Sequence, residues 1–104
     1  MAKKTVTFSS GRKVVSAAAT AEALVSADTF VLGVVIVAET NNTGVVAVGD
    51  STVIAALATR TGVPLLVGEP VTIISPESDK FINLADIYLD VTVNGDGVTY
   101  MAWV

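Results

Sequence analysis

Three oxygen-bearing side chains near the C-terminus are the first candidates for chemistry. Asp90, Asn94 and Asp96 lie close together in the sequence, and Ca²⁺ prefers oxygen ligands of this kind. Their spacing does not match a complete calcium loop, which closes with a bidentate Glu. Asp and Asn are also the residues that a tight turn needs. We therefore interpret them as turn residues and predict no metal and no other cofactor.

A serine that follows a glycine and an aspartate is the second candidate. Gly49-Asp50-Ser51 has the residue order of the nucleophile block in GDS-type esterases. Such a serine is activated by a histidine base, and this chain contains no histidine. The chain has no cysteine either, so it holds no thiol nucleophile and no thiolate metal ligand. We interpret the segment as a turn after a strand and predict that the protein is not an enzyme.

Aromatic side chains offer a binding surface instead of a reaction. Tyr88, Tyr100 and Trp103 occur in one C-terminal segment and could share a face that stacks against sugars. The alternative is that they pack in the core and across neighbouring strands, and this interpretation is favoured.

The elements that would position these side chains are short strands. Apolar residues alternate with polar ones from Asp86 to Asn94, the period of a strand with one solvated face. Asn94–Gly97 is typical of a hairpin turn, after which Val98–Val104 is expected to pair back. Seven to nine such segments predict an all-β fold, an antiparallel β-sandwich or a jelly-roll-like barrel.

The middle of the chain predicts a second hairpin. Phe30–Ala38 has no polar side chain, residues 41–44 suit a turn, and Val45–Val48 returns as an apolar strand. A strand that is apolar on both faces is expected to be central in its sheet or covered by another chain. Gly33 inside it indicates a bulge or a close approach of another group to the backbone.

The remaining segments are less regular. Residues 14–27 are interpreted as strand, loop and strand, with Glu22–Val25 as the second strand. Ser51–Thr61 fits a short helix or an edge segment. Val63–Leu66 is expected to be extended because it contains a proline, and Val71–Ser75 is a further strand.

Charge is distributed unevenly along the 104 residues. Four basic residues and no acid occur in the first 13 positions, whereas the rest carries two basic residues against ten acids. We predict a basic N-terminal arm, residues 1–13, and a single acidic β-sandwich domain, residues 14–104. The net charge of −4 argues against nucleic-acid binding. The apolar run Phe30–Ala38 is too short to span a membrane.

Composition favours association with another protein. Apolar residues make up 52% of the chain and charged residues only 15%, which is a low charge content for a small monomer. We therefore expect part of the apolar surplus at subunit contacts, in a homo-oligomer. The alternative is that abundant Ala and Val raise the apolar count without exposing apolar surface.

Several segments, taken in order, resemble small virion proteins encoded in the structural modules of tailed phages. The resemblance covers roughly residues 20–102 and is carried by Thr20–Val25, Gly33–Ala38, Asn42–Gly44 with Val46–Asp50, Pro64–Leu65 with Gly68–Glu69, Asn83–Leu89 and Gly95–Tyr100. It implies a capsid decoration, or cement, protein that binds the major capsid protein on the outer surface of the virion and is made in the host cytoplasm. It also implies a homo-oligomer, with a trimer favoured over a dimer, and no catalytic residues.

The basic arm and the apolar strand are where we expect the capsid or subunit interface. The residues concerned are Lys3, Lys4, Phe8, Arg12, Lys13, Val31, Val35 and Val37. The alternative function is a receptor- or glycan-binding β module of a phage tail or fibre, which exposed and clustered aromatic side chains would favour.

Overall fold

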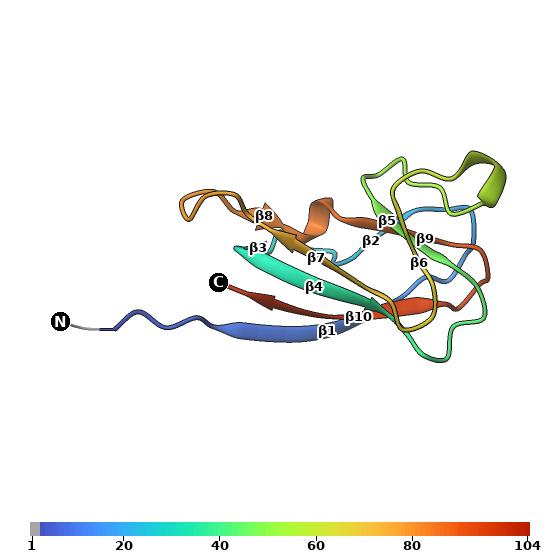
Figure 1. Ribbon diagram of the computed structural model, residues 1–104. Helices are drawn as coiled ribbons and strands as arrows, with labels where there is room; N and C mark the ends of the chain where they lie inside the picture. The colour runs from blue at the N-terminus through green and yellow to red at the C-terminus, as the bar shows by residue number, and fades with distance from the viewer. Residues whose placement is uncertain (1–2) are drawn as a thin grey trace.

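The computed structural model describes residues 3–104, and this part of the chain is almost entirely β (Figure 1). It contains ten strands and two short 3₁₀ helices. The strands form three antiparallel sheets, none of which closes into a barrel within these residues. The prediction of an antiparallel all-β fold is confirmed. The strand number exceeds the predicted seven to nine because three of the strands have only two residues.

Two four-stranded sheets and one two-stranded sheet make up the fold. Sheet A has the strand order β1 (Phe8–Val14), β10 (Gly97–Trp103), β4 (Gly33–Ala38), β7 (Pro70–Ile74). Sheet B has the order β2 (Glu22–Ala23), β9 (Tyr88–Val91), β5 (Val46–Gly49), β6 (Val63–Leu65). Sheet C pairs β3 (Phe30–Val31) with β8 (Ile82–Asn83). The 3₁₀ helices are η1 (Leu57–Thr59) and η2 (Leu84–Asp86).

The core lies between sheet A and the layer formed by sheets B and C (Figure 1). Val34 and Ile36 of β4 point into it from one side, and Leu89 and Val91 of β9 point into it from the other. All four side chains are buried. Every second residue of each strand therefore enters the same apolar layer, as the alternation of side chains along a strand requires.

Both predicted hairpins are wrong. β4 belongs to sheet A and β5 to sheet B, so residues 39–45 cross between the two layers instead of returning to a neighbouring strand. In the same way β9 lies in sheet B and β10 in sheet A. The cause is that Asn, Asp and Gly suit any tight change of direction, whether the chain pairs back or crosses to the opposite sheet.

The two crossings are bonded to each other. The side-chain amide of Asn42 donates to the carbonyl oxygen of Gly97 at 2.9 Å and accepts from the Gly97 N–H at 2.9 Å. The carboxylate of Asp96 accepts from the N–H of Thr43 at 3.0 Å and from that of Gly44 at 2.7 Å. Asn42 and Asp96 are both buried. The residues predicted to shape two separate hairpins therefore join the crossings at one end of the fold.

The boundary expected at residue 13 also needs correction. β1 begins at Phe8, so Arg12 and Lys13 lie inside sheet A. Ahead of β1, Thr7 exchanges two backbone hydrogen bonds with Val104, at 2.7 and 2.9 Å. The part of the predicted arm that projects beyond the sheet is residues 3–6, which we call the arm (Figure 1). Met1 and Ala2 lie outside the described residues.

The strand predicted at Phe30–Ala38 is divided at Leu32 into β3 of sheet C and β4 of sheet A. As expected for an apolar strand, β4 is central in its sheet. The remaining local predictions agree with the structure. The strand expected at Glu22–Val25 is β2, the extended segment at Val63–Leu66 contains β6, and the strand at Val71–Ser75 matches β7 within one residue. Ser51–Thr61 contains the short 3₁₀ helix η1 and no strand.

Candidate protein interface

Sheet A has one face toward the core and one face that no other part of residues 3–104 covers. Paired residues share a face, so the register defines rows across the sheet. Phe8, Trp103, Gly33 and Ile74 form the first row on the uncovered side. The next rows are Ser10, Met101, Val35, Thr72 and Arg12, Thr99, Val37, Pro70. We call the surface made by Phe8, Trp103, Ile74, Met101, Val35 and Val37 the apolar face.

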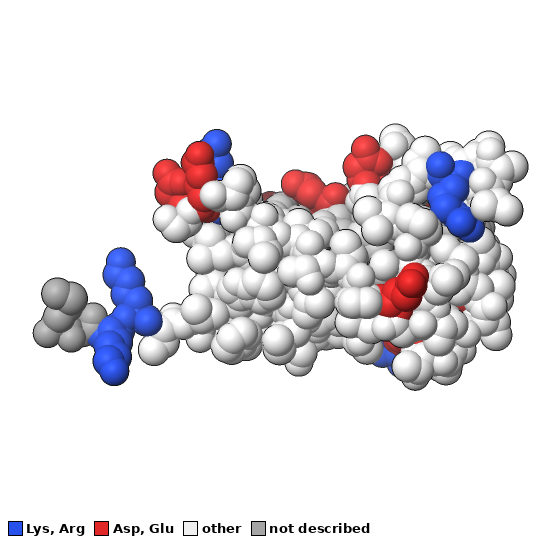
Figure 2. Space-filling view, in the orientation of Figure 1, with Lys and Arg blue, Asp and Glu red and all other residues white. Residues whose placement is uncertain are grey.

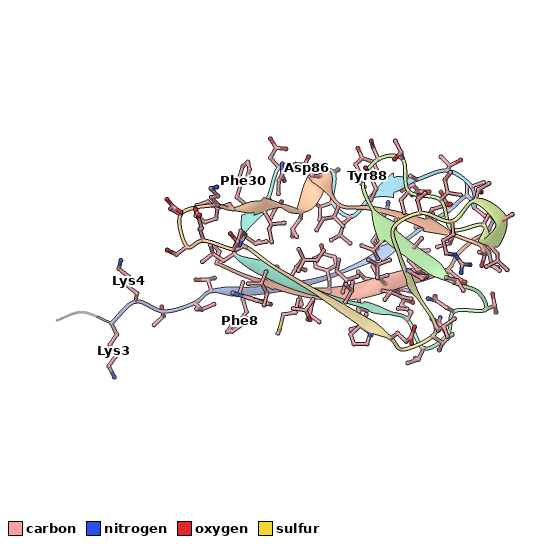
Figure 3. All side chains as sticks on the ribbon, turned by 45° about the horizontal axis from the view of Figure 1, so that its top comes forward. Lys3, Lys4, Phe8, Phe30, Asp86 and Tyr88 are labelled. Carbon is pink, nitrogen blue, oxygen red and sulfur yellow. The ribbon has the colours of Figure 1, made fainter. Side chains whose placement is uncertain are left out.

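The apolar face exposes large side chains to solvent. Phe8 is 62% exposed, Ile74 65% and Met101 42%, while Val35 and Val37 are half-buried. Figure 3 shows the Phe8 side chain on the side of β1 that points away from the core. A shallow groove of about 530 Å³ crosses the middle rows, between β1 and β4. Contiguous apolar surface of this kind is typical of a site where another protein binds.

Gly33 positions the one tryptophan of this face. The Trp103 indole lies directly over Gly33 on the neighbouring strand, where a side chain on residue 33 would overlap the ring. Gly33 keeps regular pairing on both sides, with Trp103 and Ile74. Of the two predicted meanings of this glycine, the close approach is therefore correct and the bulge is not.

The face carries a single charged residue in these three rows, and that charge is paired. The Arg12 guanidinium donates from Nε and from Nη2 to the two carboxylate oxygens of Glu39, the second contact at 3.0 Å. The hydrogen bond from Arg12 to this carboxylate, and then its negative charge, raise the pKa of Arg12 above its usual value. A partner that covers the face therefore does not have to desolvate an isolated charge.

Lys13 points to the opposite side of β1 from Arg12. Its Nζ lies 3.0 Å from Glu22 Oε1 of β2, so this ion pair joins sheet A to sheet B. Burial by itself raises the pKa of the Glu22 carboxyl. The hydrogen bonds from Lys13 and from the hydroxyl and N–H of Ser16, together with the lysine charge, outweigh burial and lower this pKa overall. Lys13 therefore connects the sheets and is not on the apolar face.

The structure separates the eight predicted interface residues into four groups, and Lys13, which pairs with Glu22, is a group of its own. Four of them share the uncovered side of sheet A: Phe8, Arg12, Val35 and Val37. Val31 is only 2% exposed and packs in the core, so it is not available to a partner. Lys3 and Lys4 lie on the arm, beyond the end of the sheets (Figure 3).

Sequence reasoning missed half of the apolar face. Met101 and Trp103 occupy alternate positions of β10, and Ile74 ends β7. The alternation of Thr99, Met101 and Trp103 was the available signal. It could not be used because β10 was expected to pair with β9 instead of lying between β1 and β4.

The aromatic residues near the C-terminus do not form a platform. Tyr88 packs against the small cluster outside sheet B, Tyr100 packs against the main core, and Trp103 lies on the apolar face. The three rings therefore occupy different surfaces.

The oxygen ligands considered for calcium also separate. Asp90 is 1% exposed instead of facing solvent, because the segment after β5 covers it and Ala55 donates an N–H to its Oδ2. Asn94 Oδ1 accepts from the N–H of Ala18 at 2.7 Å, and Asp96 bonds to the β4–β5 crossing. Within residues 3–104 no three His, Cys, Asp or Glu side chains lie close enough to hold a metal ion.

The serine candidate lies in a turn, as interpreted from the sequence. Asp50 accepts from the hydroxyl of Thr52 at 2.7 Å and from its N–H at 3.0 Å. These two bonds lower the pKa of Asp50. The carboxylate therefore stabilises the turn after β5.

Comparisons of this chain with models of known protein families, with curated proteins and with solved structures found no match. Neither 3₁₀ helix in the described part of the chain has the length and apolar character needed to cross a membrane.

Proposed function

We propose that this protein is a capsid decoration protein of a tailed phage, and that its apolar face binds the outer surface of the major capsid protein. The observation that carries the proposal is the uncovered side of sheet A, where three strands contribute large exposed apolar side chains around a neutralised ion pair. The sequence resemblance to phage virion proteins supports the choice of a capsid as the partner. In this role the protein has no catalytic function and resides on the virion.

The geometry of the apolar face suits a broad, flat contact. Full burial of a large apolar side chain stabilises a complex by about 1.5–3 kcal/mol relative to full exposure. Phe8, Ile74 and Met101 retain roughly half of their surface in solvent, so each has a substantial part of that free energy left to contribute. We also propose that the two layers of this fold are a β-sandwich, which presents sheet A as a flat binding surface.

Co-sedimentation with shells that lack this protein tests the proposal. Met101→Lys places a charge in the centre of the apolar face, and we expect at least tenfold weaker binding, equivalent to about 1.4 kcal/mol. Leu57→Lys is the matched control, because Leu57 is an 80% exposed apolar residue on η1, away from sheet A. Equal binding of Met101→Lys and the wild-type protein would exclude the apolar face as the contact.

One observation favours the second candidate, a receptor- or glycan-binding module of a tail or fibre. Phe30 is 57% exposed and Phe81, which directly precedes β8, is 53% exposed. Both lie at sheet C, where Asn83 donates to the Asp28 carboxylate at 3.0 Å. Binding of the protein to host cells or polysaccharide that Phe30→Ser abolishes, with no binding to shells, would establish this function instead.

A further inference from the structure

Asp90 is a buried carboxylate with an unused oxygen. It lies on β9 opposite Ala47 of β5, and its side chain is on the outer side of sheet B, opposite to the core residues Leu89 and Val91. Its Oδ2 accepts the N–H of Ala55 at 2.8 Å, but its Oδ1 has no hydrogen-bond partner within residues 3–104. A buried carboxylate oxygen without a donor is costly, so this position calls for a cation or another donor.

A hollow of about 210 Å³ adjoins Asp90. It lies beside the part of β9 that extends past the end of β2, since β2 pairs only with Tyr88 and Leu89. Its lining consists of Ala18, Ala19, Ala56, Asp90, Val91 and Thr92. Small apolar walls around a single acid fit an aliphatic chain that ends in an ammonium group, which is the chemistry of a lysine side chain.

The cations of residues 7–104, which we call the body, each have another partner. Arg12, Lys13 and Lys80 pair with Glu39, Glu22 and Glu77. Arg60 donates from Nε to the carbonyl oxygen of Ala55 at 2.8 Å.

The arm carries the remaining two lysines. Lys3 and Lys4 form no ion pair with any residue of 3–104, and they project beyond the sheets (Figures 2 and 3). The arm lies at the opposite end of the molecule from η1, which directly follows Ala56 (Figure 1). A chain therefore cannot place its own arm in its own hollow.

We propose that the hollow at Asp90 receives a lysine of the arm, Lys3 or Lys4, from a second copy of this chain. The contact joins two different surfaces, so it is heterologous and closes into a ring when the rotation between copies permits. Charge complementarity supports this occupant, because the basic arm meets an acidic body (Figure 2). The contact is separate from the apolar face, so it goes beyond the proposed function and holds whether or not the partner of that face is a capsid.

Sedimentation velocity over a range of protein concentrations measures this contact. We expect the wild-type protein to associate and both Asp90→Asn and the double variant Lys3→Ser/Lys4→Ser to associate at least tenfold more weakly. Lys80→Ser is the control, because it removes a lysine of the body and should associate like the wild type. Combining the arm and Asp90 substitutions should weaken association no further than either alone, since both remove the same contact.

A mixing experiment provides the sharpest test. The Asp90→Asn protein keeps its arm, and the Lys3→Ser/Lys4→Ser protein keeps its hollow, so an equimolar mixture should form one-to-one pairs although each variant alone stays monomeric. Ala56→Leu, at an exposed position, fills the hollow without changing Asp90 and should block association if Asp90→Asn folds poorly. A monomeric wild-type protein, or variants that assemble like the wild type because water alone occupies the hollow, would overturn the proposal.

Discussion

Replacing Asp96 by Ala should destabilise the fold strongly, because this carboxylate holds the two crossings between the sheets together. It accepts two backbone N–H groups, from Thr43 at 3.0 Å and from Gly44 at 2.7 Å, and it is 5% exposed. A hydrogen bond to a charged group contributes about 1.5–3 kcal/mol. Water can partly replace the acceptor because Gly44 is half-buried, so we take the lower end for each bond. The expected loss is about 3 kcal/mol.

Urea unfolding followed by circular dichroism measures this loss. A domain of this length has a free energy of unfolding of about 5–15 kcal/mol, so the midpoint should move well outside experimental error. Asp96→Asn keeps one acceptor oxygen and should lose about half as much. Asp79→Ala, an exposed acid in the loop before β8, is the control and should change stability by less than about 0.5 kcal/mol. A loss below about 0.5 kcal/mol for Asp96→Ala would refute the role given to the linked crossings.

Two further predictions concern sheet A and its connection to sheet B. Gly33→Ala should displace the Trp103 ring and lower the free energy of unfolding by about 1–3 kcal/mol. The fluorescence emission of the single tryptophan should shift to longer wavelength, and unchanged emission and stability would contradict the packing described. The folded-state pKa of Glu22 lies below its ordinary value of 4.5, so its ion pair with Lys13 stabilises the fold above that pH and the contribution disappears as the pH falls through the folded pKa. The unfolding free energy of Glu22→Gln should therefore fall less than that of the wild type between pH 7 and pH 3, and equal pH dependence in urea titrations would show that the pair contributes nothing.

The sequence was sufficient to predict an antiparallel all-β fold, but it was not sufficient to predict which strands pair. The alternation around Leu89 and the turns rich in Asn and Gly identify short strands, because both follow from local geometry. Whether a turn such as residues 94–97 returns the chain to the next strand or carries it to the other sheet depends on long-range packing. Asn42 and Asp96 stabilise the second outcome here by bonding to each other's crossing.

The candidate interface was predictable to a similar extent. Phe8 and Val35 could be named from charge and apolar patterning, but Met101 and Ile74 join them only through the order β1, β10, β4, β7. The burial of Asp90 could not be predicted either. Its position in the alternation is that of a solvated residue, and a distant segment, which includes Ala55, covers it.

Hydroxyl-radical footprinting of the protein mixed with phage shells tests the proposed capsid contact, the central claim, most directly. Met101 and Phe8 are exposed, oxidisable side chains on the apolar face, and Phe30 is a comparably exposed aromatic on sheet C. If the apolar face contacts the capsid, the oxidation of Met101 and Phe8 should fall several-fold on the particle while that of Phe30 stays at its level in free protein. Protection of Phe30 with undiminished oxidation of Met101 and Phe8 would contradict binding through the apolar face and would place the contact at sheet C.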